Sequence, residues 1–204
     1  MTLRQKRVPR RQRLIEIGLE LFSTRSYDEV AIDDIADEAG IAKGLLYYYF
    51  PTKHDFYVAV VRSAAEQLLA MTNPDETLPP LERLRRGLTA YLTYVEQHAD
   101  AYRALLRGGV GVDRQVAAIV DEVRTEYARR VCQGLLGGRE PSPPVGVAVS
   151  GWVGFVEALS LAWLEQREIE KETLCELAVT ALLAIVEKTP DGRQVLHSSV
   201  HEAD

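Results

Sequence analysis

The chain has 204 residues, 47% of them hydrophobic, and its 24 lysines and arginines against 30 aspartates and glutamates give a formal net charge of −6. This composition excludes a largely disordered chain and allows one domain, or a small domain joined to a larger one. Two cysteines, Cys132 and Cys175, are too few for a disulfide framework and fit a reducing cytoplasm, where we expect the protein to act.

Charge is unevenly distributed along the chain. The first thirteen residues hold six basic side chains and no acidic one, whereas the rest holds 18 basic and 30 acidic residues. This basic arm, which includes Arg10 and Arg11, suits contact with a polyanion at one end of the molecule. A solvated, frayed terminus and a segment that lies on anionic lipid are the alternatives. No apolar signal-peptide core follows the arm, so secretion is not expected.

Apolar residues recur at helical spacing along most of the chain and predict an all-α fold of about nine helices. A first helix is expected over 10–25, and two short helices over 32–39 and 43–50 are separated by Gly40. Pro51 ends the second short helix, and Thr52 with Asp55 forms a capping box that opens the next helix. Later helices are expected near 81–95, 99–106, 116–136, 145–165 and 171–188.

Residues 32–50 have the anatomy of a helix-turn-helix, in which two short helices are joined by a tight turn that contains glycine. Leu46 and Phe50 lie four residues apart and can pack on the preceding helix, which leaves the opposite helix face open. That open face offers Lys43, Gly44, Leu45, Tyr47 and Tyr48.

The open face suits duplex DNA. Lys43 and Lys53 can neutralise phosphates, and tyrosine hydroxyls can hydrogen-bond phosphate oxygens. Gly44 allows close approach to the groove, and Leu45 can contact a thymine methyl group. An aromatic core patch over 47–50 is the alternative; it fits Phe50, but three consecutive tyrosines cannot all face one core.

Acidic residues crowd the first short helix of this motif. They are interpreted as a solvated face and as partners of the helix dipole rather than as a site. They are Asp33, Asp34, Asp37 and Glu38.

Residues 10–57 resemble the N-terminal DNA-binding domain of TetR-family transcriptional regulators. The residues that carry the resemblance are Ile35-Ala36, Ala39-Gly40-Ile41, Lys43-Gly44, Leu46-Tyr47, Phe50-Pro51 and Lys53. The resemblance implies a DNA-binding domain over 1–51, a linking helix over 52–72, a ligand-binding and dimerisation domain over 73–188 and a flexible tail over 189–204.

The resemblance also implies roles for single residues. Lys43, Gly44, Tyr47 and Lys53 match positions that dock on the operator, and Leu45 and Tyr48 match positions that vary with the DNA site. The family often has threonine or serine where Ala31 and Ala42 stand. Loss of these hydroxyl caps predicts weaker helix starts, by on the order of 1 kcal/mol each. Arg10 and Arg11 in the arm are expected to offset the lost contacts by reaching phosphates or the minor groove.

Residues 145–164 form a run of 20 residues with a single charged side chain, Glu157, so a membrane span has to be considered. Several glycines and serines in the run argue against lipid contact, and small residues spaced by four favour close helix packing. In TetR-like proteins the last two helices of each subunit form a four-helix dimer interface, and ordinary intrachain core is the alternative. The expected interface residues are Gly154, Ala158, Ala162, Leu174, Ala178, Ala181, Leu182 and Ile185.

Bulky aromatic groups and one acid on the inner helices are candidates for a ligand pocket. A carboxylate among aromatic rings could engage a cationic or hydrogen-bonding ligand. Ordinary core packing, or pairing of the acid at a subunit interface, is the alternative. The candidates are Tyr91, Tyr94, Tyr102, Tyr127, Trp152, Phe155 and Glu157.

The resemblance therefore implies a ligand-responsive regulator, most often a repressor, that binds palindromic operator DNA as a homodimer and is released by a small-molecule effector. A helical small-molecule-binding protein or enzyme with a vestigial helix-turn-helix is the first alternative, and a membrane-peripheral helical protein is the second. The sequence shows no catalytic motif, no metal-ligand spacing and no cofactor fingerprint. We therefore expect no catalytic residues, no metal, no cofactor and no membrane partner.

Overall fold

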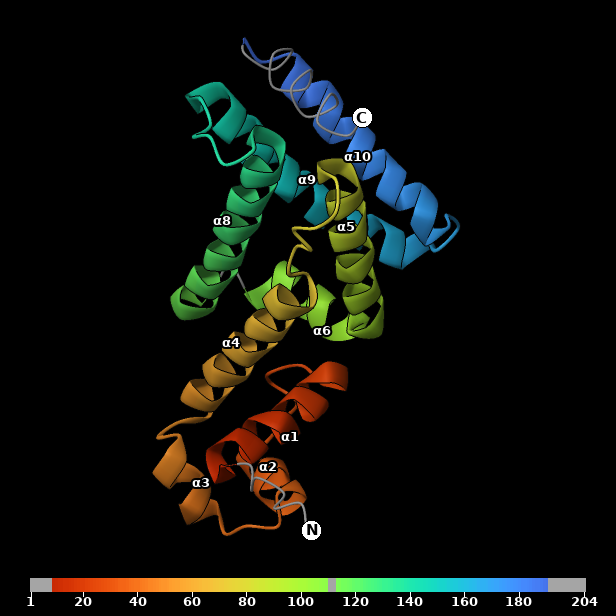
Figure 1. Ribbon diagram of the computed structural model, residues 1–204. Coiled ribbons are helices and arrows are strands. Elements are labelled where there is room, and N and C mark those ends of the chain that lie inside the picture. Colours follow the sequence, from red (N-terminus) through yellow and green to blue (C-terminus); the bar gives the residue numbers. More distant parts are fainter. Residues whose placement is uncertain (1–8, 110–112, 191–204) are drawn as a thin grey trace, which may run out of the picture. The chain divides into compact units, whose positions relative to one another are not determined.

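The computed structural model describes residues 9–109 and 113–190, and within these ranges it contains nine α-helices, one short π-helical segment and no strand (Figure 1). The predicted all-α fold is confirmed. The elements are α1 (Arg10–Thr24), α2 (Ile32–Glu38), α3 (Lys43–Tyr49), α4 (Lys53–Met71), α5 (Pro80–Gln97), α6 (Ala99–Ala104), η1 (Leu105–Gly109), α8 (Arg114–Leu136), α9 (Pro143–Gln166) and α10 (Lys171–Glu187).

Local chemistry sets the helix boundaries in the helix-turn-helix. Gly40 has a φ of 62° and lets the chain leave α2 in a left-handed turn, in which the Ile41 N–H donates to the Ala36 carbonyl at 3.0 Å. The Thr52 N–H and hydroxyl donate to Asp55 Oδ2 at 3.0 and 2.7 Å, and the Asp55 N–H donates to Thr52 Oγ1 at 3.0 Å. The predicted capping box is thereby confirmed.

Contacts divide the chain into two compact units: unit 1 comprises residues 1–67 and 98–119, and unit 2 comprises residues 68–97 and 120–204. The sequence had suggested a ligand-binding domain over 73–188, whereas the contacts group 98–119 with the N-terminal helices. Two packing relationships explain the difference. Helix α6 contacts α1, and Val116 and Ile119 on α8 pack with Val61 on α4.

Unit 1 is built on one apolar cluster that fixes the helix-turn-helix to α1 and α4. Helix α2 contacts both α1 and α3, and Leu46 on α3 is fully buried. At Gly18 on α1 the packing leaves no room for a side chain, because a Cβ there would lie 2.4 Å from Val60 Cγ2 and 2.6 Å from Phe56 Cζ. The cluster consists of Leu14, Ile15, Phe22, Val30, Ile35, Leu46, Phe50, Phe56 and Val60.

In unit 2, α10 packs against α5 and α9, and α5 also packs against α9. Helix α9 begins after Ser142 with Pro143 and Pro144, whose missing N–H groups need no partner at a helix start. Ser142 occupies the predicted N-cap position, but its hydroxyl makes no capping hydrogen bond. Of the predicted tail over 189–204, residues 191–204 lie outside the described part of the chain.

Candidate DNA-binding surface and effector domain

Helix α3 presents a polar and aromatic surface to solvent. Leu46 and Phe50 are held in the unit 1 core, which turns the opposite face of the helix outward. Tyr48 is 79% exposed and Tyr47 is 41% exposed, so neither is the core aromatic of the alternative interpretation. We name the outward-facing residues Lys43, Gly44, Tyr47 and Tyr48 the recognition surface; the fifth residue expected there, Leu45, is half-buried.

Gly44 leaves open space at the start of α3, since a Cβ built there would meet no atom within 4 Å. The free protein therefore has no packing reason to require glycine at this position. The absence of a side chain here leaves room for close approach of another molecule.

Both predicted phosphate-binding lysines have partners within the chain. The Lys43 ammonium lies 2.8 Å from Asp33 Oδ1, and this hydrogen bond raises the pKa of Lys43. Lys53 Nζ lies 4.2 Å from the centre of the Tyr27 ring, a cation–π contact that leaves the lysine side chain half-exposed. Both lysines are thus held near the helix-turn-helix by contacts within unit 1.

The described part of the basic arm begins at the start of α1. Arg10 and Arg11 are exposed, and the Arg11 guanidinium lies 4.9 Å from the centre of the Phe50 ring, just after the end of α3. Arg11 therefore adds positive charge beside the helix that carries the recognition surface. Arg13, also exposed, follows Arg10 and Arg11 in α1, and the other three basic residues of the arm, Arg4, Lys6 and Arg7, lie outside the described residues.

Alanine occupies the N-cap of α2 and of α3, and neither helix start has a side-chain cap from that position. At α2 the chain replaces part of the lost interaction, because the Ala31 N–H donates to Asp34 Oδ2 at 3.0 Å. This hydrogen bond and the Arg25 guanidinium lower the pKa of Asp34. Asp34 therefore supports the helix start, as the helix-dipole interpretation expected.

The predicted pocket residues do not all come together. Tyr91 and Tyr94 on α5 are buried, and the Tyr91 ring meets the Tyr127 ring edge-on with centres 6.0 Å apart. The Trp152 indole N–H donates to the Ala178 carbonyl at 2.7 Å, which ties this ring to α10. Phe155 is 40% exposed on the outside of α9, because the inner side of the helix is occupied by its neighbours Trp152 and Val156. Tyr102 belongs to unit 1, not unit 2.

The carboxylate of Glu157 forms an ion pair within the chain. Arg124 on α8 donates to it through Nε at 3.1 and 3.0 Å and through an Nη at 2.7 Å. The Glu157 side chain is 18% exposed, and the pair crosses from α8 to α9. Glu157 thus has Arg124 as its cationic partner within the chain, and its role toward a ligand stays a prediction.

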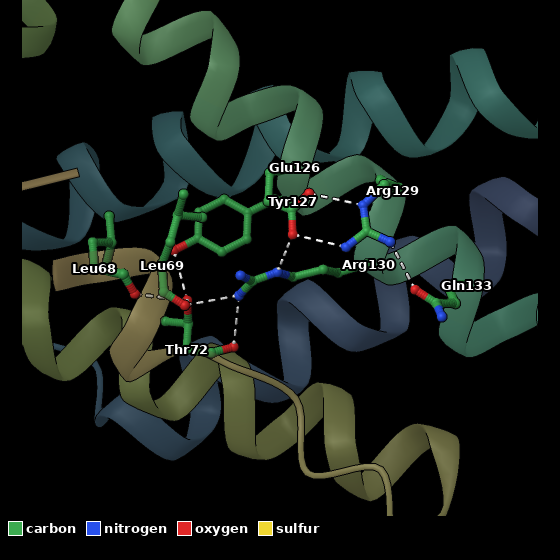
Figure 2. A network of polar contacts seen from close by, with 8 residues as sticks. All are labelled: Leu68, Leu69, Thr72, Glu126, Tyr127, Arg129, Arg130 and Gln133. Carbon is green, nitrogen blue, oxygen red and sulfur yellow. Dashed lines mark hydrogen bonds and ion pairs between the residues drawn. The ribbon is translucent and has the colours of Figure 1, made fainter. Parts of the chain in front are cut away.

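A polar network joins α8 to the last turn of α4 in unit 2 (Figure 2). The Tyr127 hydroxyl lies 3.0 Å from Thr72 Oγ1, which donates to the Leu68 carbonyl at 2.8 Å. Arg130 Nη1 donates to the Leu69 and Thr72 carbonyls at 2.9 and 3.3 Å. Carbonyls at the end of a helix have no partner inside it, so the guanidinium acts as a C-terminal cap of α4. Burial raises the pKa of Tyr127 to about 12.

Besides the apolar residues that are buried in unit 2, helices α9 and α10 carry apolar residues that are exposed to solvent. Val147 is 75% exposed, Leu177 is 48% exposed, and Phe155 and Ile185 are each 40% exposed. Gly154, Ala158 and Ala162, predicted for the dimer interface, are also exposed, and Ala181 is half-buried. We name this set the apolar face: Val147, Gly154, Phe155, Ala158, Ala162, Leu177, Ala181 and Ile185.

Three other residues predicted for the dimer interface belong to the core of the chain itself. Leu174, Ala178 and Leu182 on α10 retain at most 2% exposure. They pack inward in the part of unit 2 where α10 contacts α5 and α9, so no surface remains for a partner to cover. The burial of these three residues within the chain favours the intrachain alternative.

Helix α9 is long and apolar enough to cross a membrane, with a mean hydropathy of 1.6 in its most apolar window. Length and composition alone give this result, and the core helix of a soluble protein passes the same test. Eight residues of α9, among them Trp152, Val156 and Trp163, are buried inside the chain. Packing within unit 2 therefore accounts for the 33% of that window that is buried.

A hollow of about 360 Å³ lies where α9 ends and α10 begins. Charged side chains dominate its lining, whereas sites for small molecules are mostly apolar. None of the predicted pocket residues lines it. Its lining residues are Glu96, Trp163, Arg167, Ile169, Glu170, Lys171 and Glu172.

Sequence reasoning missed the partners of several side chains. Asp33 was interpreted as solvated but pairs with Lys43, and no role was foreseen for Arg124 or Arg130. It also missed Asp113, whose Oδ2 lies 2.6 Å from His54 Nε2 while its Oδ1 accepts the Val116 N–H. Asp34, three residues after the N-cap, had a detectable signal, because that spacing is half of a capping box. The long-range pairs had no comparable signal.

Two family models match the chain, one near its N-terminus and one in its C-terminal part, and residues 98–119 fall within the second match. Residues 14–60 match the family described as "Bacterial regulatory proteins, tetR family", and residues 80–185 match "Tetracyclin repressor-like, C-terminal domain". The chain is 32% identical over 182 residues to the HTH-type transcriptional activator FasR of Mycolicibacterium smegmatis, covering 85% of this chain and 82% of FasR. It is 31% identical over 126 residues to the HTH-type transcriptional repressor DhaR of a Mycobacterium species, covering 60% of each.

Solved structures show the same fold. A tetR-family transcriptional regulator from Streptomyces coelicolor superposes with a TM-score of 0.86 at 32% identity, covering 94% of this chain and 88% of that one. The transcriptional regulator FadR from Bacillus subtilis, solved in complex with stearoyl-CoA, gives a TM-score of 0.66 at 15% identity over 84% of this chain and 96% of FadR. The second likeness concerns the fold alone.

Proposed function

Because the chain belongs to the TetR family of transcriptional regulators, and is a DNA-binding regulator rather than an enzyme, we propose that it binds palindromic operator DNA as a homodimer and that a small-molecule effector changes this binding. The main observation in support of the proposal is that α3 exposes the recognition surface while its other side packs in the unit 1 core. Its place of action would be the cytoplasm, where operator DNA is found.

The size of the recognition helix supports the dimer. Helix α3 has seven residues, so one copy can reach only a few base pairs. A two-fold pair of such helices reads two half-sites, which explains how a short helix can select one site in a genome. The apolar face supports such a pair, because large exposed apolar patches on folded proteins commonly mark interaction sites.

The network at the end of α4 supports a response to an effector. Tyr127 is one of the predicted pocket residues, and its hydroxyl is bonded to Thr72 just after α4. A ligand that took over this hydroxyl would remove one of the contacts that hold the end of α4 (Figure 2). Ligand and DNA would then affect each other's affinity by the same factor.

Stearoyl-CoA is the first effector to test, because FadR of the same fold was solved with it. Thermal melting of the protein with stearoyl-CoA, and with free coenzyme A as the control, would report binding. The family members FasR and DhaR are an activator and a repressor, so repression stays a prediction. A reporter gene behind the selected operator would decide the sign of regulation.

Selection of binding sites from a random duplex library with the full chain tests the DNA-binding proposal. We expect two inverted half-sites with centres about 34 Å apart or a larger helical multiple. Binding to the selected duplex should weaken steeply between about 50 and about 200 mM salt. Lys43→Gln should weaken binding, and Lys188→Gln, an exposed lysine in unit 2, should not. Failure to enrich any duplex would contradict the proposal.

A further inference from the structure

The ion pair between Lys43 and Asp33 joins the two helices of the helix-turn-helix. The Lys43 ammonium lies 2.8 Å from Asp33 Oδ1 and 3.0 Å from Oδ2, so both carboxylate oxygens face it. The Lys43 side chain is 48% exposed and the Asp33 side chain 67% exposed. The pair is thus made at the surface, beside Gly44 and the rest of the recognition surface, where an incoming DNA strand would meet it.

Asp34 and Asp37, two other acids of α2, differ from Asp33 in their contacts. Asp34 is engaged with the Ala31 N–H and with Arg25. Asp37 is exposed on the same helix, and the structure gives it no ion pair with any residue in 9–109 or 113–190. Asp33 is therefore the acid of α2 that meets the lysine of α3, and Asp37 offers a matched comparison.

We propose that Asp33 is an intramolecular competitor of the DNA backbone for Lys43, and that it weakens binding of this chain to duplex DNA whatever the base sequence. The proposal rests on the DNA-binding function above. A carboxylate and a phosphate are both oxyanions that accept hydrogen bonds from an ammonium group. Lys43 must therefore exchange one for the other, and Asp33 adds a negative charge close to the phosphate.

The expected effect is modest because the pair is exposed. Measured free energies of exposed ion pairs correspond to about a two- to fivefold change in an equilibrium constant. Phosphate contacts carry no sequence information, so operator and random DNA should be affected equally. Asp33 would thus lower affinity on all DNA without changing the ratio between specific and non-specific binding.

The test compares Asp33→Asn with the wild-type chain by fluorescence anisotropy on a random-sequence duplex. We expect Asp33→Asn to bind about two- to fivefold more tightly at about 50 mM salt, with a smaller gain at about 200 mM salt. Asp37→Asn removes the same charge from the same helix without touching Lys43, and should change affinity less than Asp33→Asn. In a Lys43→Gln background, Asp33→Asn should have no further effect, since its competition acts through Lys43.

Three results would overturn the inference. Weaker binding by Asp33→Asn would mean that Asp33 positions Lys43 for DNA instead of competing for it. Equal gains from Asp33→Asn and Asp37→Asn would assign the effect to net charge, and a gain that persists with Lys43→Gln would assign it to another partner. Melting curves of each variant would confirm that the helix-turn-helix stays folded. If the wild-type chain bound no duplex at all, the proposed function itself would be wrong.

Discussion

Gly18 on α1 and Val60 on α4 are packed so closely that a Cβ on the glycine would lie 2.4 Å from Val60 Cγ2. Phe56, one turn before Val60 on α4, crowds the same site, because the same Cβ would lie 2.6 Å from Phe56 Cζ. Helix α1 therefore approaches α4 at a distance that only glycine permits. Residues of α1 and α4 share one apolar cluster with Leu46 of α3, so this close contact lies in the part of unit 1 that supports the helix-turn-helix.

Gly18→Ala should destabilise the protein by about 1 to 3 kcal/mol, because the added methyl group overpacks a filled core. Gly87→Ala is the matched control: Gly87 also lies in a helix, α5, but a Cβ added there would meet no atom within 4 Å. Alanine there should stabilise the protein by up to about 1 kcal/mol through helix propensity. Urea unfolding of both variants measures the difference, and equal effects would show that the site near Val60 relaxes.

Gly44→Ala should weaken DNA binding without destabilising the folded protein. The free protein has open space at this position, so its unfolding free energy should stay unchanged or rise slightly. Binding to the selected operator should weaken, because the methyl group would lie between α3 and the groove. Anisotropy and urea unfolding on the same preparation test both halves. Unchanged operator affinity would mean that α3 does not approach DNA closely at Gly44.

Charge placed on the apolar face should separate the proposed dimer into protomers. Phe155→Glu and Leu177→Glu each put a carboxylate on this face, where burial against a second copy would desolvate it. Ile169→Glu is the control, because Ile169 is equally exposed but lies between α9 and α10 and not on the apolar face. Sedimentation velocity should show protomers for the first two variants and dimers for the control. A dimer that survives both changes would place the interface elsewhere.

Removal of Glu126 should make the free energy of unfolding less dependent on pH in the acid range. Hydrogen bonds from Arg129, and further contacts with Arg130, lower the pKa of Glu126 from 4.5 to about 2. The unfolded state therefore binds a proton more readily, so this contribution to stability is complete above pH 4.5 and is lost as pH falls toward 2. Its size is on the order of 1 kcal/mol, because solvent screens a partly exposed pair.

The measurement is urea unfolding of the wild-type chain and of Glu126→Gln at pH 6 and pH 3. The wild-type chain should lose more stability than the variant over this interval. Equal losses in the two proteins would show that Glu126 keeps an ordinary pKa in the folded state.

Arg130→Met should loosen the end of α4. Its guanidinium caps the Leu69 and Thr72 carbonyls, and loss of hydrogen bonds from a charged donor typically costs about 1.5 to 3 kcal/mol. Arg129→Met is the control, because Arg129 pairs with the same Glu126 but does not reach α4. Amide hydrogen exchange should accelerate in the last turn of α4 only in Arg130→Met. Equal exchange in both variants would exclude a capping role.

The parts of the fold that were predictable from sequence are those fixed by neighbouring residues. Gly40, Pro51 and the Thr52–Asp55 box each act within one turn of helix, so their effect can be read without knowing the rest of the chain. The recognition surface was predictable for the same reason, because the four-residue spacing of Leu46 and Phe50 decides which side of α3 is buried.

The sequence did not predict which of two similar apolar surfaces of a helix is buried. Helix α10 has two apolar stripes, one with Leu174, Ala178 and Leu182 and another with Leu177, Ala181 and Ile185, and periodicity does not say which one faces inward. The partner of Glu157 was hidden for a related reason: Arg124 lies 33 residues away, and only tertiary packing brings the two together. The grouping of 98–119 with unit 1 likewise depends on packing.

The exposed apolar face of α9 and α10 has a consequence for gene control. If protomers must meet before they can occupy an operator, dilution lowers both their thermal midpoint and their occupancy of DNA. Newly synthesised copies would then circulate alone until enough of them accumulate. Transcription from the target promoter would therefore vary more steeply than linearly with the amount of regulator that the cell makes.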